Sequence, residues 1–188
     1  MVAEVLQYIA DGIKIKSAEA DALYAGIVID THNFTNQTGV RTFEAAAFLK
    51  RNGADVVRVR KLFRDDLDDY KAKAEAVREA EIFEKYFAIS VCPSEGIGSP
   101  TVIGAQAANE LLDIAGIKAS VVMSHYNNTV FMSARSIDEV NVQVMMEKLG
   151  GGGHRTIAGA QLADVTIEEA KTRLKAVIKE MLEKGDIS

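Results

Sequence analysis

The sequence has one cysteine, two prolines and no tryptophan among its 188 residues. The lone cysteine, Cys92, excludes an internal disulfide framework and a zinc ribbon. No apolar run approaches the roughly 20 residues of a membrane span, and the first residues lack the basic and apolar segments of a signal peptide. We therefore expect a cytoplasmic location and no membrane contact by this chain.

Basic residues are also fewer than acidic residues. Lys and Arg number 22 against 27 Asp and Glu, giving a net charge of −5. This balance argues against a broad basic surface for long nucleic acids, but it allows a small anionic ligand in a local positive pocket. Hydrophobic residues make up 48% and charged residues 26%, as in globular proteins. The length suits one domain or two small ones.

The pattern of apolar residues predicts the α/β fold class, with a boundary near Lys85. Residues 1–84 read as helices and loops: helices at 2–9 and 17–30, a polar loop at 30–43, a helix capped by Thr42, and a charged helix at 65–83. Residues 56–63 fit a strand or a helix equally well. Because this part lacks strands on which its helices could pack, we expect it to be the helical remainder of a larger α/β domain.

Residues 86–188 read as a self-contained unit with a mixed sheet. Strands are expected in YFAISVC, in KASVVMSHY and TVFMSAR, which form a hairpin around Asn127-Asn128, and in AGAQL. Helices are expected in TVIGAQAANELLDIAG, in DEVNVQVMMEKLG, and after Thr166 as a cap.

Four consecutive glycines, ending in Gly151, Gly152 and Gly153, lead directly into His154. Consecutive N–H groups without side chains can form a concave nest for an anion, and His154 can donate to a phosphate oxygen. On this reading, a Cβ at Gly152 or Gly153 would collide with the ligand or force a glycine-only conformation. The alternative is a flexible turn between a helix and a strand.

The segment SARS places Ser133 and Arg135 at the end of an expected strand. Arginine presents a planar fork of donors that fits phosphate. Alone, Arg135 would more simply pair with Asp138 or Glu139 on the surface. Its position beside the glycine run favours an anion site.

Asp30 lies where an apolar helix meets a polar loop. The helix dipole disfavours a carboxylate at a C-terminus, so a compensating contact such as a metal ion is one interpretation, with His32 as a second ligand. The simpler one is an Asx turn beside a solvated histidine. His125 is expected only on the hairpin surface.

These segments resemble a known family. GGGGHRTIAGAQ resembles the glycine–histidine motif of the DHH-associated domain, and SARS followed by EVNVQVMMEKLGGGGH is similar to the form in GdpP-type bacterial cyclic-di-AMP phosphodiesterases. AGIVIDTHNFTNQTGVRTFEAAAFLKRNGAD is similar to the last part of their DHH domain. The resemblance covers essentially the whole chain, with residues 1–84 as the end of a DHH domain and 86–188 as the DHH-associated domain.

The resemblance implies hydrolysis of cyclic-di-AMP to linear pApA, a second-messenger reaction, by two metal ions, usually manganese. It makes Asp30 one metal ligand and places His154 against the substrate. Ser133, Arg135 and the glycines Gly151, Gly152 and Gly153 are then expected to hold phosphate or nucleotide. The partner is a cyclic dinucleotide.

The family's other metal motifs, a histidine followed by spaced aspartates and the aspartate-histidine-histidine motif, are absent from this sequence. We therefore expect a C-terminal fragment of a membrane-anchored protein, inactive alone because one carboxylate cannot organise two metals. Within the superfamily, a nanoRNase or 3′-phosphoadenosine phosphatase is the alternative. A non-catalytic nucleic-acid-binding module and a homodimer formed through residues 1–84 are further alternatives.

Overall fold

The computed structural model describes residues 2–9, 14–35, 38–137 and 139–185, and it divides into two compact units that meet between Arg64 and Asp65. This division precedes the boundary expected near Lys85, because helix α5 (Leu67–Arg78) packs on α6 (Pro100–Leu112) in the second unit. The assignment of residues 1–84 to the end of a DHH domain stays a prediction.

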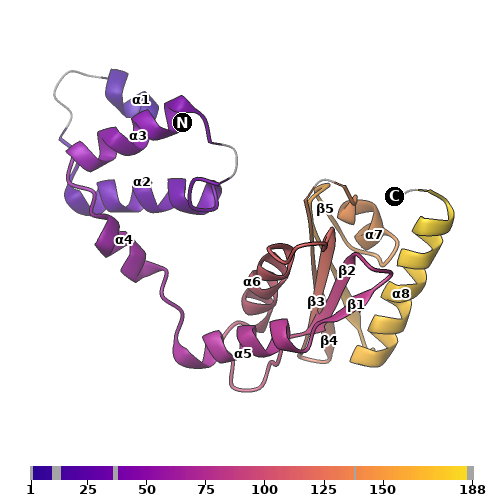
Figure 1. Ribbon diagram of the computed structural model, residues 1–188. Helices are drawn as coiled ribbons and strands as arrows, with labels where there is room; N and C mark the ends of the chain where they lie inside the picture. The colour runs from indigo at the N-terminus through magenta and orange to yellow at the C-terminus, as the bar shows by residue number, and fades with distance from the viewer. Residues whose placement is uncertain (1, 10–13, 36–37, 138, 186–188) are drawn as a thin grey trace. The chain divides into compact units, whose positions relative to one another are not determined.

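The described part of the first unit is helical (Figure 1). Its helices are α1 (Val2–Ile9), α2 (Ser17–Asp30), α3 (Val40–Arg51) and α4 (Val56–Leu62). The core is built largely from alanine, with Leu49 fully buried among them, so the helices approach closely. The expected Thr42 cap was wrong, because α3 already begins at Val40. The ambiguous segment is helix α4, since the Asp55 carboxylate caps it by accepting from the N–H groups of Val57 and Arg58.

The second unit is a six-stranded sheet, within the described residues, with helices on both faces (Figure 1). Its strands are β1 (Glu81–Phe83), β2 (Phe87–Val91), β3 (Ala119–Tyr126), β4 (Thr129–Ser136), β5 (Gly152–Gly153) and β6 (Ile157–Ala163). They lie in the order β1-β2-β3-β4-β6-β5. β2 and β3 pair in parallel and the other neighbours pair antiparallel, so the expected mixed sheet is confirmed.

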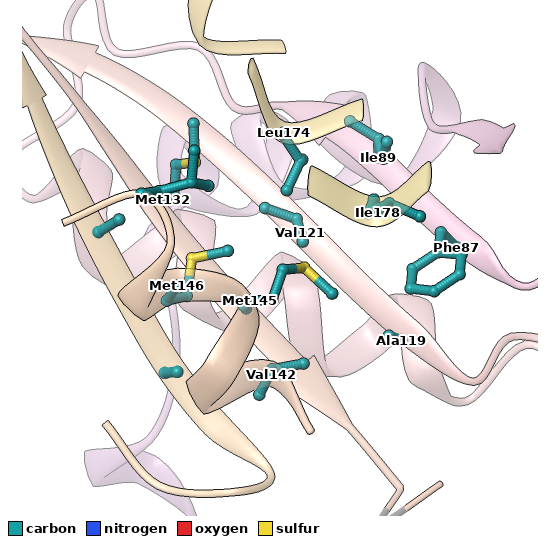
Figure 2. Packing of buried hydrophobic residues seen from close by; sticks show 14 of the residues in the cluster. Phe87, Ile89, Ala119, Val121, Met132, Val142, Met145, Met146, Leu174 and Ile178 are labelled. Atoms are coloured by element: carbon teal, nitrogen blue, oxygen red, sulfur yellow. The ribbon is translucent and has the colours of Figure 1, made fainter. Parts of the chain in front are cut away.

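One face of this sheet carries the main core. Strand residues Phe87, Val121 and Met132 pack there against α7 (Val142–Glu147) and α8 (Ile167–Glu183). Figure 2 shows Leu174 and Ile178 of α8 beside Phe87, Ile89 and Val121, with Met145 and Met146 of α7 alongside. The unit therefore has a large apolar core of its own.

The opposite face is only partly covered. α6 packs on β3 and β4, with α5 beside it. Strand residues alternate between faces, so Phe131, Ser133 and Arg135 point to the α6 side, while the buried residues between them point to the main core.

The expected hairpin turn at Asn127 and Asn128 is confirmed, with φ of +48° and +58°. None of the helices in the described ranges is long and apolar enough to cross a membrane.

Candidate functional site

A cleft of about 440 Å³ opens on the partly covered face of the second unit. Its floor is formed by the middle of β4 and β6, and its walls by the start of α6 and by the glycine run. The lining residues are Thr101, Phe131, Met132, Ser133, Gly150, Gly151, Gly152, Gly159, Ala160 and Gln161. The cleft thus brings together Ser133 and two of the glycines singled out from the sequence.

Part of the glycine run already has its N–H groups bonded within the fold. Gly150 and Gly151 donate to the carbonyls of Glu147 and Met146, at 3.0 and 2.8 Å, and so close the end of α7. His154 donates its backbone N–H to Ile157 at 2.7 Å, within the turn that joins β5 to β6. Because these N–H groups are already engaged, side chains are the better candidates for holding an anion.

The glycines of the run differ in what an added Cβ would meet. A Cβ on Gly151 would lie 2.6 Å from the Cα of Ala160, and a Cβ on Gly153 would lie 2.5 Å from the Cα of Ala158. Gly153 also has a φ of +148°. Both glycines are therefore required by the close approach of the glycine run to β6. At Gly153 the φ matches the expected glycine-only conformation, and the clash is with β6.

Gly152 is different. A Cβ there would meet no atom within 4 Å, and the residue lines the cleft. The fold leaves this space open, so Gly152 is the glycine whose missing side chain would serve an incoming ligand.

Arg135 lies two residues beyond Ser133 on the same face of β4, half-buried against α6. Its Nε donates to the Asn109 side-chain oxygen at 3.0 Å, and one terminal nitrogen donates to the Ala134 carbonyl at 2.9 Å. Among the described residues, no carboxylate forms an ion pair with this guanidinium; Glu139, one expected partner, pairs instead with Lys118 at 3.1 Å. Asp138 lies outside the described residues.

Burial lowers the pKa of the Arg135 guanidinium from its usual value. A half-buried cation held only by neutral groups retains a desolvation cost that an arriving anion would offset. An anion beside Arg135 would therefore be favoured by the guanidinium charge.

His154 is exposed in the turn between β5 and β6. The same turn is tied to the end of β4, because the Ser136 N–H donates to the Thr156 carbonyl at 3.0 Å. His154 and Arg135 therefore belong to the same end of the β4–β6 pair, since Arg135 lies opposite Ile157.

Asp30 is the last residue of α2, as expected, and its side chain is exposed in the first unit. The next residues, His32, Asn33 and Phe34, all have positive φ, of 45°, 58° and 66°. Such a left-handed stretch costs energy in non-glycine residues. The described residues contain no group of three or more His, Cys, Asp or Glu placed to hold a metal ion. The described residues around Asp30 therefore do not by themselves form a two-manganese site.

The cleft residues that were not predicted from the sequence include Thr101, Phe131 and Gln161. Phe131 and Gln161 lie two residues from Ser133 and Gly159 respectively, so the two-residue period of a strand places them on the same face. That period was the available signal.

A mixed sheet with helices on both faces makes this unit an α/β domain, and a cleft with a glycine wall opens on it. The chain belongs to the DHHA1 domain family, which it matches over residues 84–184.

Relatives extend the likeness over nearly the whole chain. It is 45% identical over 98% of its length to the cyclic-di-AMP phosphodiesterase GdpP of Geobacillus thermodenitrificans. It is 42% identical over 95% of its length to the cyclic-di-AMP phosphodiesterase PdeA of Listeria monocytogenes. The chain spans only 28% and 27% of the length of these proteins.

Among solved structures, an exopolyphosphatase-related protein from Bacteroides fragilis matches with a TM-score of 0.78 and 20% identity. The match covers 89% of this chain and 51% of that one. At this identity, the likeness shows a shared fold.

Proposed function

We propose that this chain acts within a cyclic-di-AMP phosphodiesterase, where its second unit binds the substrate and Asp30 supplies one ligand to a two-manganese centre. The reaction is hydrolysis of the cyclic dinucleotide to linear pApA. The metals would activate water and neutralise phosphate charge. Ligands beyond Asp30 would come from residues outside this chain, so the 188 residues alone are expected to be inactive.

The observation that carries this proposal is the half-buried Arg135 guanidinium, which has no carboxylate partner among the described residues. It lies on the same strand face as Ser133, which lines a cleft whose wall at Gly152 is bare backbone. In the proposed complex, Arg135 and Ser133 donate to a phosphate and Gly152 lets it approach. His154 donates from the turn at the same end of the strands. The relatives named above support the choice of cyclic-di-AMP.

The test measures turnover by a longer protein that contains this chain, with manganese, on cyclic-di-AMP, on short oligoribonucleotides and on 3′-phosphoadenosine. Cyclic-di-AMP is expected to be hydrolysed most efficiently, and Arg135→Gln to lower its kcat/KM by about 10²-fold, as for loss of one preorganised donor. Gln143→Leu, at an exposed hydrogen bond to Glu147 on α7, is the control. Efficient turnover of oligoribonucleotides or 3′-phosphoadenosine alone would assign the chain to the nanoRNase or phosphatase alternative.

A further inference from the structure

Phe131 and Gln161 lie opposite each other on β4 and β6, two residues along each strand from the Ser133–Gly159 pair. Directly opposed residues on antiparallel strands project their side chains to the same side of the sheet. Both side chains line the cleft, and Thr101 at the start of α6 lines it with them. An aromatic ring, an amide and a hydroxyl therefore meet at one end of the cleft.

The second feature of this end of the cleft is its polar side chains. Within the part of the chain that the structure describes, no hydrogen bond engages the side chains of Gln161 or Thr101. Phe131 is half-buried, and Gln161 is exposed. A flat ring beside an unpaired amide is suited to a ligand that both stacks and presents hydrogen-bonding edges, as a nucleobase does.

From this arrangement we infer that Phe131 and Gln161 form a nucleobase subsite that prefers adenine. The inference rests on the proposed function only in requiring that the cleft binds a nucleotide. Phe131 stacks on the base, and the Gln161 amide reads its edge. Adenine offers a donor at N6 beside an acceptor at N7, which matches the acceptor and donor of one amide. Guanine offers two acceptors at the same edge, so the amide oxygen would face another oxygen.

The spacing between Phe131 and Ser133, the residue proposed to bind phosphate, fits a single nucleotide. Ser133 follows Phe131 by two residues, which along an antiparallel strand is about 7 Å. A ribose separates a base from its phosphate by a comparable length. The base end of the cleft, at Phe131 and Gln161, is thus one sugar away from Ser133, and Arg135 lies two residues further along the same face of β4.

The experiment titrates the 188-residue chain with AMP, GMP, ribose 5-phosphate and cyclic-di-AMP by calorimetry. The variants are Gln161→Leu, Phe131→Leu and Phe131→Tyr, with Gln143→Leu as a matched glutamine control outside the cleft. Melting temperatures are recorded for each protein, and the conservative Phe131→Tyr keeps the ring should Phe131→Leu fail to fold.

The unchanged chain is expected to bind AMP more tightly than GMP by about ten-fold, the effect of one two-point amide contact. Gln161→Leu should remove this preference without weakening ribose 5-phosphate. Phe131→Leu should weaken AMP and GMP alike, and Phe131→Tyr should restore both. The subsite is overturned if Gln161→Leu weakens all ligands equally, if it weakens none, or if AMP binds no more tightly than ribose 5-phosphate. A Gln161-dependent AMP preference without binding of cyclic-di-AMP would uphold the subsite and count against the proposed substrate.

Discussion

Arg135 on β4 is held by Asn109 on α6, through a hydrogen bond of 3.0 Å from Nε to the amide oxygen. The contact joins a cation to a neutral group, although an aspartate has the same shape as asparagine. An aspartate here would form an ion pair, which would satisfy the guanidinium before any ligand arrived. The amide positions the cation and leaves its charge available.

Asn109→Asp tests this relationship. The new ion pair should stabilise the chain by up to about 1 kcal/mol, since such pairs contribute little near the surface, and raise Tm by about 2–4 °C. In the longer enzyme, kcat/KM should fall by about ten-fold because the carboxylate competes with phosphate for Arg135. Calorimetric melting and steady-state kinetics check the two effects. A higher Tm with unchanged kcat/KM would mean that Arg135 does not contact the substrate.

Alanine substitutions at the glycines separate fold from function. Gly151→Ala and Gly153→Ala force a Cβ into the backbone of β6, so each should lower the free energy of unfolding by about 2 kcal/mol or more. Gly152→Ala enters open space, so Tm should hold while kcat/KM falls. Melting curves and turnover per folded molecule provide the measurement. If Gly152→Ala retains full activity, no ligand passes over this backbone.

Elements with local sequence signals were predicted, whereas elements defined by pairing were not. Helix α8 after Thr166 and the hairpin at Asn127-Asn128 were predicted because their signals are local. Strand β5 was missed because glycine carries no strand propensity, and it is defined only by pairing with β6. Edge strand β1 was missed because it has three residues and no alternation to read.

The candidate site was predicted only in part, because some of its features are local in the sequence and others depend on the fold. Residue types and spacing drew attention to Ser133, Arg135 and the glycine run, and their presence in one unit follows from the strand order. The capture of the Gly151 N–H by Met146 depends on where α7 ends in space. No local sequence pattern indicates that contact. The sequence alone therefore could not show that the Gly151 N–H is already bonded.

The first unit should be sensitive to acid through Asp21. This buried carboxylate accepts from Arg58 at 2.6 Å and from the Asp55 N–H at 2.7 Å, and the Arg58 contact is the main cause that lowers its pKa. Because the folded pKa lies below the unfolded value, the stabilisation is complete above about pH 5 and is lost as pH falls through the folded pKa.

Asp21→Asn should therefore destabilise the first unit at pH 7, by an amount that shrinks toward pH 2. Hydrogen exchange of the Asp55 amide across this range measures it. Asp68→Asn, at an exposed carboxylate on α5, is the control and should show little change at any pH. A pH-independent difference for Asp21→Asn would mean that the charge of Asp21 does not support the unit.

Asp30 provides the test of the metal-ligand proposal. In the longer enzyme, Asp30→Ala should lower kcat by at least roughly 10³-fold, because loss of a metal ligand removes charge stabilisation and water activation together. Stability should hold or rise slightly, since the change removes an exposed carboxylate from the C-terminal end of α2. Asp113→Ala is the matched control, because Asp113 is an exposed carboxylate at the C-terminal end of α6. Manganese titration, melting temperature and kcat are measured on both variants. If Asp30→Ala behaves like Asp113→Ala, with normal turnover and normal manganese dependence, Asp30 is only the last residue of a helix.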